Sequence, residues 1–299
     1  MIIKIATRKS PLALVQAEMV RNKLLAAFPG VTCELVAMST SGDDNADRVL
    51  AEIGGKGLFT KELEEGLLSG KFDIAVHSLK DMETILPQGL MLAAVLERED
   101  PRDALIAKDN KKLADLGKVR FGTSAMRRAA QLKIISPDIE IVNIRGNVAT
   151  RLQKVVNGEV DATMLAFAAL KRLNLQDQAS EVLSSEYFIP AVGQGIIAIE
   201  CRENNTQMRD MLAQINHAES FIAATAERSL LAVLDGSCRT PIAGYAEING
   251  NNLRLNSLIA KPDGSFYTKA ERSGNIADAV KIGQEVAAEL LANGGRDCL

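Results

Sequence analysis

The chain has 299 residues, which is enough for two or three domains of ordinary size. Its composition, 47% hydrophobic and 24% charged, excludes a disordered or fibrous protein. The net charge is only −3, with 35 basic and 38 acidic residues, so it predicts no general attraction to nucleic acid or to an anionic membrane.

The first residues, MIIKIATRKSPLAL, form a short apolar run followed by charge, without the core or cleavage site of a signal peptide. No apolar stretch approaches the length of a bilayer span. We therefore expect a cytoplasmic protein.

Short β-type runs alternate with amphipathic helical stretches over the first two-thirds of the chain. The β-type runs are residues 2–6, 33–39, 72–78, 103–109, 119–124 and 139–144. The helical stretches include residues 11–28, 58–70 and 148–156. This alternation predicts an α/β fold.

Two segments are expected to carry the chain between α/β domains. The charged, proline-containing segment EREDPR, residues 97–102, interrupts the alternation and is typical of a hinge. The Gly-rich and β-branched segment IPAVGQGIIAIECR, residues 189–202, is expected to return the chain. The predicted domains are 1–96 with 196–215 for the first, and 97–195 for the second.

Residues 216–299 differ in character from the rest. A long helix over residues 218–235 precedes three β-type runs, which are separated by N-G-N-N and P-D-G turns. A final helix is expected over residues 276–292. The pattern predicts a small C-terminal α+β domain with an antiparallel sheet.

Arginine stands at three junctions where a β-type run passes into a helix. The arginines are Arg8, Arg127, Arg128, Arg145 and Arg151. The predicted helix N-caps are Ser10, Thr123 or Ser124, and Asn147. Gly146 permits a close approach of the backbone in the third junction. A ligand in an open α/β sheet binds at such carboxyl ends of strands, where helix N-termini also point.

Cations in the first turn of a helix oppose its dipole by about 0.3–1 kcal/mol each, so a purely structural sequence favours Asp or Glu there. Arginine also binds carboxylates in a bidentate manner. The three junctions therefore predict a small ligand with several carboxylates or phosphates, although solvated surface arginines remain the alternative. Arg172 lies on a helical stretch and is a further candidate.

The segment AVHSLKDM predicts a strand that ends near Lys80 and Asp81, which places a carboxylate close to the arginines. A turn cap is the alternative role for Asp81. His77 is interpreted as a structural histidine. The run GGKGLFTKELE fails the phosphate-loop spacing and instead favours a mobile lid that includes Lys56 and Phe59.

The four cysteines and two histidines are too scattered to form a metal site, so no metal is predicted. Cys238 alone has a setting that suggests chemistry. It lies in the loop LDGSCRTPIAG beside Arg239, a cation that lowers a thiol pKa. An unused loop cysteine is the alternative.

Taken together, these segments resemble the porphobilinogen deaminase (hydroxymethylbilane synthase) family from about Ile5 to Gly244. The motifs are IATRKSPLAL, GGKGLFTKELE, DIAVHSLKD, EREDPRDA, GTSAMRRAAQL, RGNVATRL, PAVGQG and GSCRTPI. Where the family often has a serine, this chain has Ala125, which removes one hydroxyl. Glu83 also departs from a proline that is common after the K-D pair.

The resemblance implies three domains, of which the first two are α/β domains built like solute-binding proteins around a cleft and joined by two crossing segments. It implies a monomeric transferase of haem, porphyrin and tetrapyrrole biosynthesis. Such an enzyme condenses four porphobilinogen molecules, with release of ammonia, into hydroxymethylbilane. The primer is a dipyrromethane cofactor held by a thioether.

The matching positions assign the site residues. Asp81 matches the catalytic carboxylate. The implied cofactor-binding residues are Cys238, Ser78, Lys80, Asp81, Thr123, Ser124, Arg127, Arg128, Arg145 and Gly146. The implied substrate-binding residues are Arg8, Ser10, Arg145, Arg151, Arg172 and Gln194.

Two other classes remain open on sequence alone. A two-domain carboxylate-binding protein without catalysis shares the arginine-lined cleft, but it does not explain Asp81 or Cys238. The effector domain of a transcription regulator requires a basic helix-turn-helix segment, which the sequence does not contain.

Overall fold

A computed structural model describes residues 1–40, 60–236 and 240–299. Its contacts divide the chain into two units, residues 1–99 with 196–221 and residues 100–195 with 222–299. The division does not test the three predicted domain boundaries, which remain a prediction. Among the described residues, no helix is both long and apolar enough to cross a membrane.

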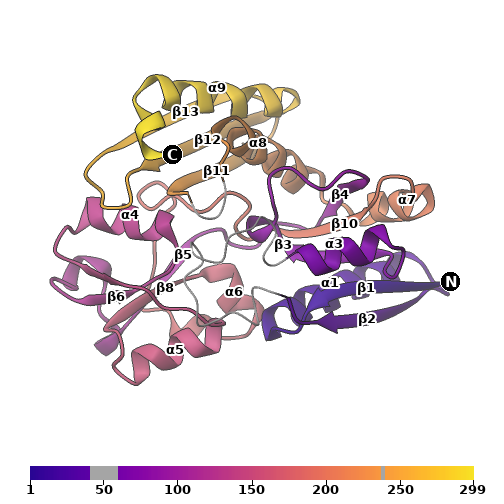
Figure 1. The fold of residues 1–299 in the computed structure, drawn as a ribbon, viewed down its shortest axis with the longest axis horizontal. Coiled ribbons are helices and arrows are strands. Elements are labelled where there is room, and N and C mark those ends of the chain that lie inside the picture. The colour runs from indigo at the N-terminus through magenta and orange to yellow at the C-terminus, as the bar shows by residue number, and fades with distance from the viewer. Residues whose placement is uncertain (41–59, 237–239) are drawn as a thin grey trace. The chain divides into compact units, whose positions relative to one another are not determined.

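The first unit is a mixed sheet with helices on both faces (Figure 1). Its strand order is β2-β1-β3-β10-β4. The strands are β1 (Ile2–Arg8), β2 (Thr32–Met38), β3 (Ile74–Ser78), β4 (Leu90–Val95) and β10 (Ile197–Arg202). The helices are α1 (Pro11–Ala27), α3 (Lys61–Leu68) and α7 (Thr206–Ile215).

Alternation along the strands decides which residues meet each helix layer, because successive side chains point to opposite faces. Ile3, Ile5, Ile74 and Val76 pack with α1 and α7. Ala6 and Ala75 belong to the opposite face, where Leu63 and Leu67 of α3 cover the sheet.

The second unit contains another five-stranded mixed sheet, in the order β7-β6-β8-β5-β9. The strands are β5 (Asp103–Ala107), β6 (Arg120–Gly122), β7 (Glu140–Val142), β8 (Ala162–Ala166) and β9 (Glu181–Val182). The helices are α4 (Met126–Ile135), α5 (Val148–Val156) and α6 (Phe167–Arg172). One core lies beneath α4, and a second lies beneath α5 and α6.

The C-terminal part is an antiparallel sheet, β11-β12-β13, packed with two helices. The strands are β11 (Ile242–Asn249), β12 (Asn252–Ala260) and β13 (Tyr267–Asn275), and the helices are α8 (Ala218–Leu234) and α9 (Ala279–Ala292). The predicted fold class, α/β with a small antiparallel C-terminal part, is confirmed.

Candidate active site

The first arginine junction folds as a strand, a tight turn and a helix. Ser10 is the N-cap of α1, and its Oγ accepts a hydrogen bond from the amide of Ala13 at 3.3 Å. Pro11 occupies the first turn of the helix, as its fixed φ favours. Arg8 ends β1 and is half-buried. The predicted cap is confirmed.

Asp81 enters the same place from the end of β3. This strand runs parallel to β1, so the carboxyl ends of both strands lie at one edge of the sheet. A single turn of 3₁₀-helix, Leu79–Asp81, follows β3 and carries both Lys80 and Asp81. Asp81 is half-buried.

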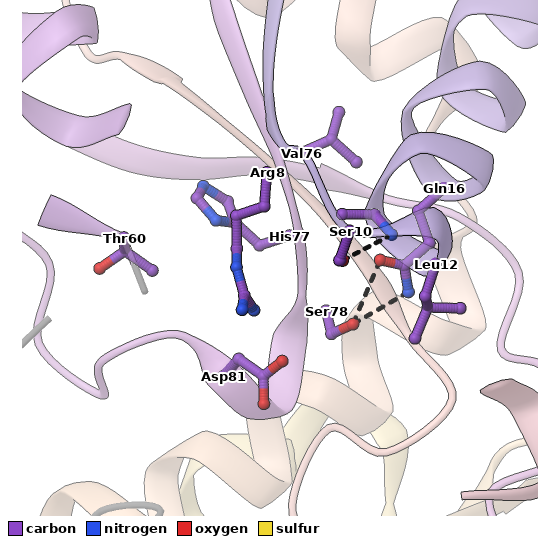
Figure 2. A pocket seen from close by; sticks show the side chains of 10 residues that line it. Arg8, Ser10, Leu12, Gln16, Thr60, Val76, His77, Ser78 and Asp81 are labelled. Carbon is purple, nitrogen blue, oxygen red and sulfur yellow. Dashed lines mark hydrogen bonds between the residues drawn. The ribbon is translucent and has the colours of Figure 1, made fainter. Parts of the chain in front are cut away.

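These side chains line one pocket, which we call the Asp81 pocket (Figure 2). The lining residues are Arg8, Ser10, Leu12, Ala13, Gln16, Thr60, Val76, His77, Ser78 and Asp81. The Arg8 guanidinium points toward Asp81 in this view. Gln16 and Ser78, which both line the pocket, form a hydrogen bond in which Gln16 Nε2 donates to Ser78 Oγ at 2.9 Å.

Sequence reasoning placed Arg8, Ser10, Ser78 and Asp81 at the site, and all four line the pocket. It did not single out Gln16, whose signal was a polar residue on the buried side of an otherwise apolar helix face. It interpreted His77, which also lines the pocket, as a structural histidine with no role in the site.

The second junction differs from its prediction. Helix α4 begins at Met126, and its N-cap is Ala125, which supplies no side-chain cap. The expected cap at Thr123 or Ser124 is therefore wrong. Thr123 Oγ1 instead accepts a hydrogen bond from the amide of Ala125 at 3.1 Å, in a local turn that precedes the helix.

Arg127 and Arg128 are buried, with only 6% and 5% of each residue exposed. Both bind Asp103 at the start of β5. Arg127 Nη1 lies 2.8 Å from Asp103 Oδ2, and Arg128 donates to Oδ1 from Nε at 3.0 Å and from Nη2 at 2.7 Å. Gln194 Nε2 donates to the same Oδ1 at 3.1 Å. We call these four side chains the Asp103 cluster.

Charge balance in the Asp103 cluster is unequal, because two guanidinium groups face one carboxylate. Burial opposes ionisation of Asp103, but the charges of Arg127 and Arg128 outweigh it and lower the pKa of Asp103 to about 2. The cluster therefore carries a surplus positive charge in a buried setting, which an anionic group placed beside it would neutralise.

Sequence reasoning missed Asp103, which is fully buried. The signal that could have found it is an acidic residue at the start of the apolar run DALIA. Such a charge on a central strand requires a partner.

The third junction is the turn between β7 and α5. Asn147 caps α5 by accepting a hydrogen bond from the amide of Thr150 at 2.9 Å, as predicted. Gly146 has φ +115°, a conformation that L-residues rarely adopt. Arg151 Nε donates to Gly146 O at 3.0 Å, and Arg145 is half-buried beside it. Arg172 of α6 contacts a different segment of the chain, because its Nη2 donates a hydrogen bond to Gly195 O at 2.7 Å.

Three predicted residues, Lys56, Phe59 and Cys238, lie outside the described residues. The other cysteines are described, and burial raises the pKa of each thiol. For Cys201 the pKa rises to about 11, and for Cys33 and Cys298 it rises above the usual range. Since the thiolate is the nucleophile, none of these three thiols is activated.

Comparison with known families gives two matches. Residues 3–210 match the model described as the dipyrromethane cofactor binding domain of porphobilinogen deaminase. Residues 221–292 match the model of the C-terminal domain of the same enzyme. Together the two models cover most of the chain.

Solved structures similar to this chain include solute-binding proteins. A TRAP periplasmic solute binding protein from Desulfovibrio salexigens is 13% identical over 74% of this chain and 73% of that chain, with a TM-score of 0.47. An extracytoplasmic solute receptor from Bordetella pertussis that binds pyroglutamic acid is 13% identical over 79% and 83%, with a TM-score of 0.44.

Proposed function

Since the chain belongs to the porphobilinogen deaminase family, a family of transferases in tetrapyrrole synthesis, we propose that it condenses four porphobilinogen molecules head to tail and releases ammonia. The product is the linear tetrapyrrole hydroxymethylbilane. The observation that carries this proposal is the pocket in which Arg8, Ser10, Ser78 and Asp81 meet.

Asp81 is the proposed catalytic residue. Loss of ammonia leaves positive charge on the substrate pyrrole, and a fixed carboxylate stabilises that charge more than it stabilises the neutral ground state. Arg8, which lines the same pocket, is proposed to bind a carboxylate of the substrate and to orient the pyrrole toward Asp81.

The Asp103 cluster fits an acidic cofactor. Its surplus positive charge is buried, so a carboxylate of the dipyrromethane beside Arg127 and Arg128 would restore neutrality. When bound, the dipyrromethane supplies the free pyrrole carbon to which the first substrate is joined. The other residues proposed to hold it are Ser78, Lys80, Thr123, Ser124, Arg145 and Gly146. Arg151, Arg172 and Gln194 are proposed to bind substrate carboxylates.

We assign the thioether to Cys238. Burial raises the pKa of the thiols of Cys33, Cys201 and Cys298, which disfavours the reactive thiolate at each of them. Cys238 is the remaining cysteine, and Arg239 follows it directly in the sequence.

Intact mass of the purified full chain tests the assignment. Wild type is expected to carry the added mass of two linked pyrroles after denaturation, because a thioether is covalent. Cys238→Ser is expected to lack that mass and to release no ammonia from porphobilinogen. Cys33→Ser is the matched control and should retain both.

Two outcomes would overturn the proposal. The added mass on Cys201, or an active protein without it, would refute the attachment at Cys238. Tight binding of porphobilinogen without any release of ammonia would instead support a carboxylate-binding protein that has no catalytic activity.

A further inference from the structure

His77 and Glu200 form a buried pair on the face of the first sheet that α3 covers. His77 lies on β3 opposite Ala198 of β10, so Glu200, two residues along, points to the same face. His77 Nε2 lies 3.1 Å from Glu200 Oε2, and the two side chains are 3% and 0% exposed. The reaction proposed above assigns neither residue a role.

Glu64 of α3 lies over this pair and adds a second buried carboxyl group. Burial raises its pKa above the usual range, and the nearby carboxylate of Glu200 raises it further. Glu64 Oε1 and Glu200 Oε1 are both buried without a hydrogen-bond partner among the described residues. Two carboxyl groups, those of Glu64 and Glu200, therefore lie near the imidazole, each with one oxygen that has no hydrogen-bond partner among the described residues.

The same imidazole also lines the pocket that contains Arg8 and Asp81 (Figure 2). His77 therefore belongs both to a buried pair with Glu200 and to the lining of the pocket that contains the proposed catalytic carboxylate. The charged or titratable groups around it come from four elements. They are Arg8 of β1, Glu64 of α3, Asp81 and Glu83 in the segment after β3, and Glu200 of β10.

A metal ion does not account for this arrangement. Among residues 1–40, 60–236 and 240–299, no group of three or more His, Cys, Asp or Glu side chains is arranged to hold one. We therefore interpret the imidazole and the two carboxyl groups through their electrostatic effect on the adjoining pocket.

We propose that His77 is a positioning residue of the Asp81 pocket. Glu200 anchors its imidazole, and the anchored imidazole sets the electrostatic environment of the pocket in which Asp81 acts while ammonia is released. This inference rests on the proposed deaminase reaction and adds to it a named group that controls its pH dependence. A purely structural pair would instead affect only stability.

Histidine NMR tests the link between His77 and the pocket without relying on turnover. The chain has only two histidines, so His217→Asn assigns both signals. His217 lies outside the pocket lining, and its Nδ1 accepts a hydrogen bond from the amide of Ser220, which Asn can replace. The protein used is the cofactor-loaded full chain with Asp81→Asn, which is expected to bind porphobilinogen and to react slowly.

Saturating porphobilinogen is expected to move the His77 imidazole signals and their pH titration while leaving those of His217 in place. Unchanged His77 signals in a protein that demonstrably binds porphobilinogen would overturn the inference. If the wild-type protein binds porphobilinogen but releases no ammonia, the proposed function fails instead, so the two failures are distinguishable.

A second experiment uses Glu200→Gln, which keeps the size and hydrogen bonding but removes the charge. The rate of ammonia release in a single turnover should fall about tenfold, and the steady-state KM should stay within about twofold of the wild-type value. One limb of the pH profile of the single-turnover rate should shift by at least half a pH unit. Glu65→Gln, on the exposed side of α3, is the matched control and should leave the profile unchanged. A lower Tm with a wild-type pH profile would show that the pair is only structural. Should Glu200→Gln fail to fold, the NMR experiment still decides.

Discussion

The Asp81 pocket and the Asp103 cluster combine arginine and aspartate in different ways. In the pocket, Asp81 is half-buried and Arg8 shares an accessible cavity with it. In the cluster, Asp103 is completely buried between Arg127 and Arg128. An arginine next to a helix N-terminus is thus compatible with an open binding site or with a buried ion network.

Burial determines what each carboxylate can contribute. A half-buried carboxylate in a pocket remains available to a substrate, so its effect is expected on the rate of reaction. A buried carboxylate that already binds two arginines is expected to act mainly on stability and on the orientation of those arginines. The following substitutions test this difference, from the largest expected effect to the smallest.

Asp81→Asn should have the largest effect, and that effect should appear in the chemical step. The substitution preserves size but removes the charge that stabilises the developing cation. Such an electrostatic contribution is about 3–5 kcal/mol, or on the order of a hundredfold to several thousandfold in rate. Single-turnover ammonia release measures it, after intact mass has confirmed that the cofactor is present.

Two variants control this prediction. Asp81→Glu retains the charge and is expected to keep measurable activity, whereas Asp210→Asn on the exposed side of α7 should behave as wild type. Turnover of Asp81→Asn within about tenfold of wild type would mean that the carboxylate is structural.

Asp103→Asn should act on stability first. It leaves two guanidinium groups buried without their counter-ion, and breaking a buried ion pair costs about 3–5 kcal/mol. Urea unfolding measures the loss in the free energy of unfolding. Glu159→Gln removes the exposed partner of Lys154 and should cost less than about 1 kcal/mol. Equal losses in the two variants would contradict the contrast between buried and exposed pairs.

The pH dependence of stability sharpens the same point. The pKa of Asp103 is about 2 in the folded protein, against an ordinary value of 3.8 for an aspartate. Because the folded-state pKa is depressed, the ionised carboxylate stabilises the fold above pH 4, and this stabilisation is lost as the pH falls toward 2. The difference corresponds to about 2 kcal/mol.

The free energies of unfolding of wild type and Asp103→Asn should therefore converge by about 2 kcal/mol between pH 5 and pH 2. Urea titrations at several pH values in this range measure the convergence. A constant difference would mean that Asp103 is not ionised preferentially in the folded state.

Local signals in the sequence predicted what depends on neighbouring residues. The caps at Ser10 and Asn147 are confirmed because each side chain binds an amide three residues away. The helix over 218–235 and the antiparallel strands after it are found where turn residues predicted them.

Long-range partners could not be predicted in this way. Asp103 meets Arg128 from 25 residues away and Gln194 from 91 residues away. His77 meets Glu200 from 123 residues away, across two antiparallel strands. No local pattern encodes which strands become neighbours, so the sequence suggested the arginines but not the carboxylate that binds two of them.

The smallest expected effect concerns Gly146, in the turn that carries Arg145 and Arg151. Its φ of +115° is costly for any residue with a Cβ, and a Cβ built there would meet Thr150 Cγ2 at 2.6 Å. Gly146→Ala should therefore cost about 1–3 kcal/mol of stability. Gly30→Ala is the matched control because Gly30 also has a positive φ, +92°, but its Cβ would meet no atom within 4 Å. Its expected cost is only about 1 kcal/mol.

Because Arg151 donates to Gly146 O, displacement of this turn should also raise KM for porphobilinogen in Gly146→Ala and not in Gly30→Ala. Thermal unfolding and steady-state kinetics on the two variants measure both effects, and an unchanged KM in a destabilised Gly146→Ala protein would separate this turn from substrate binding.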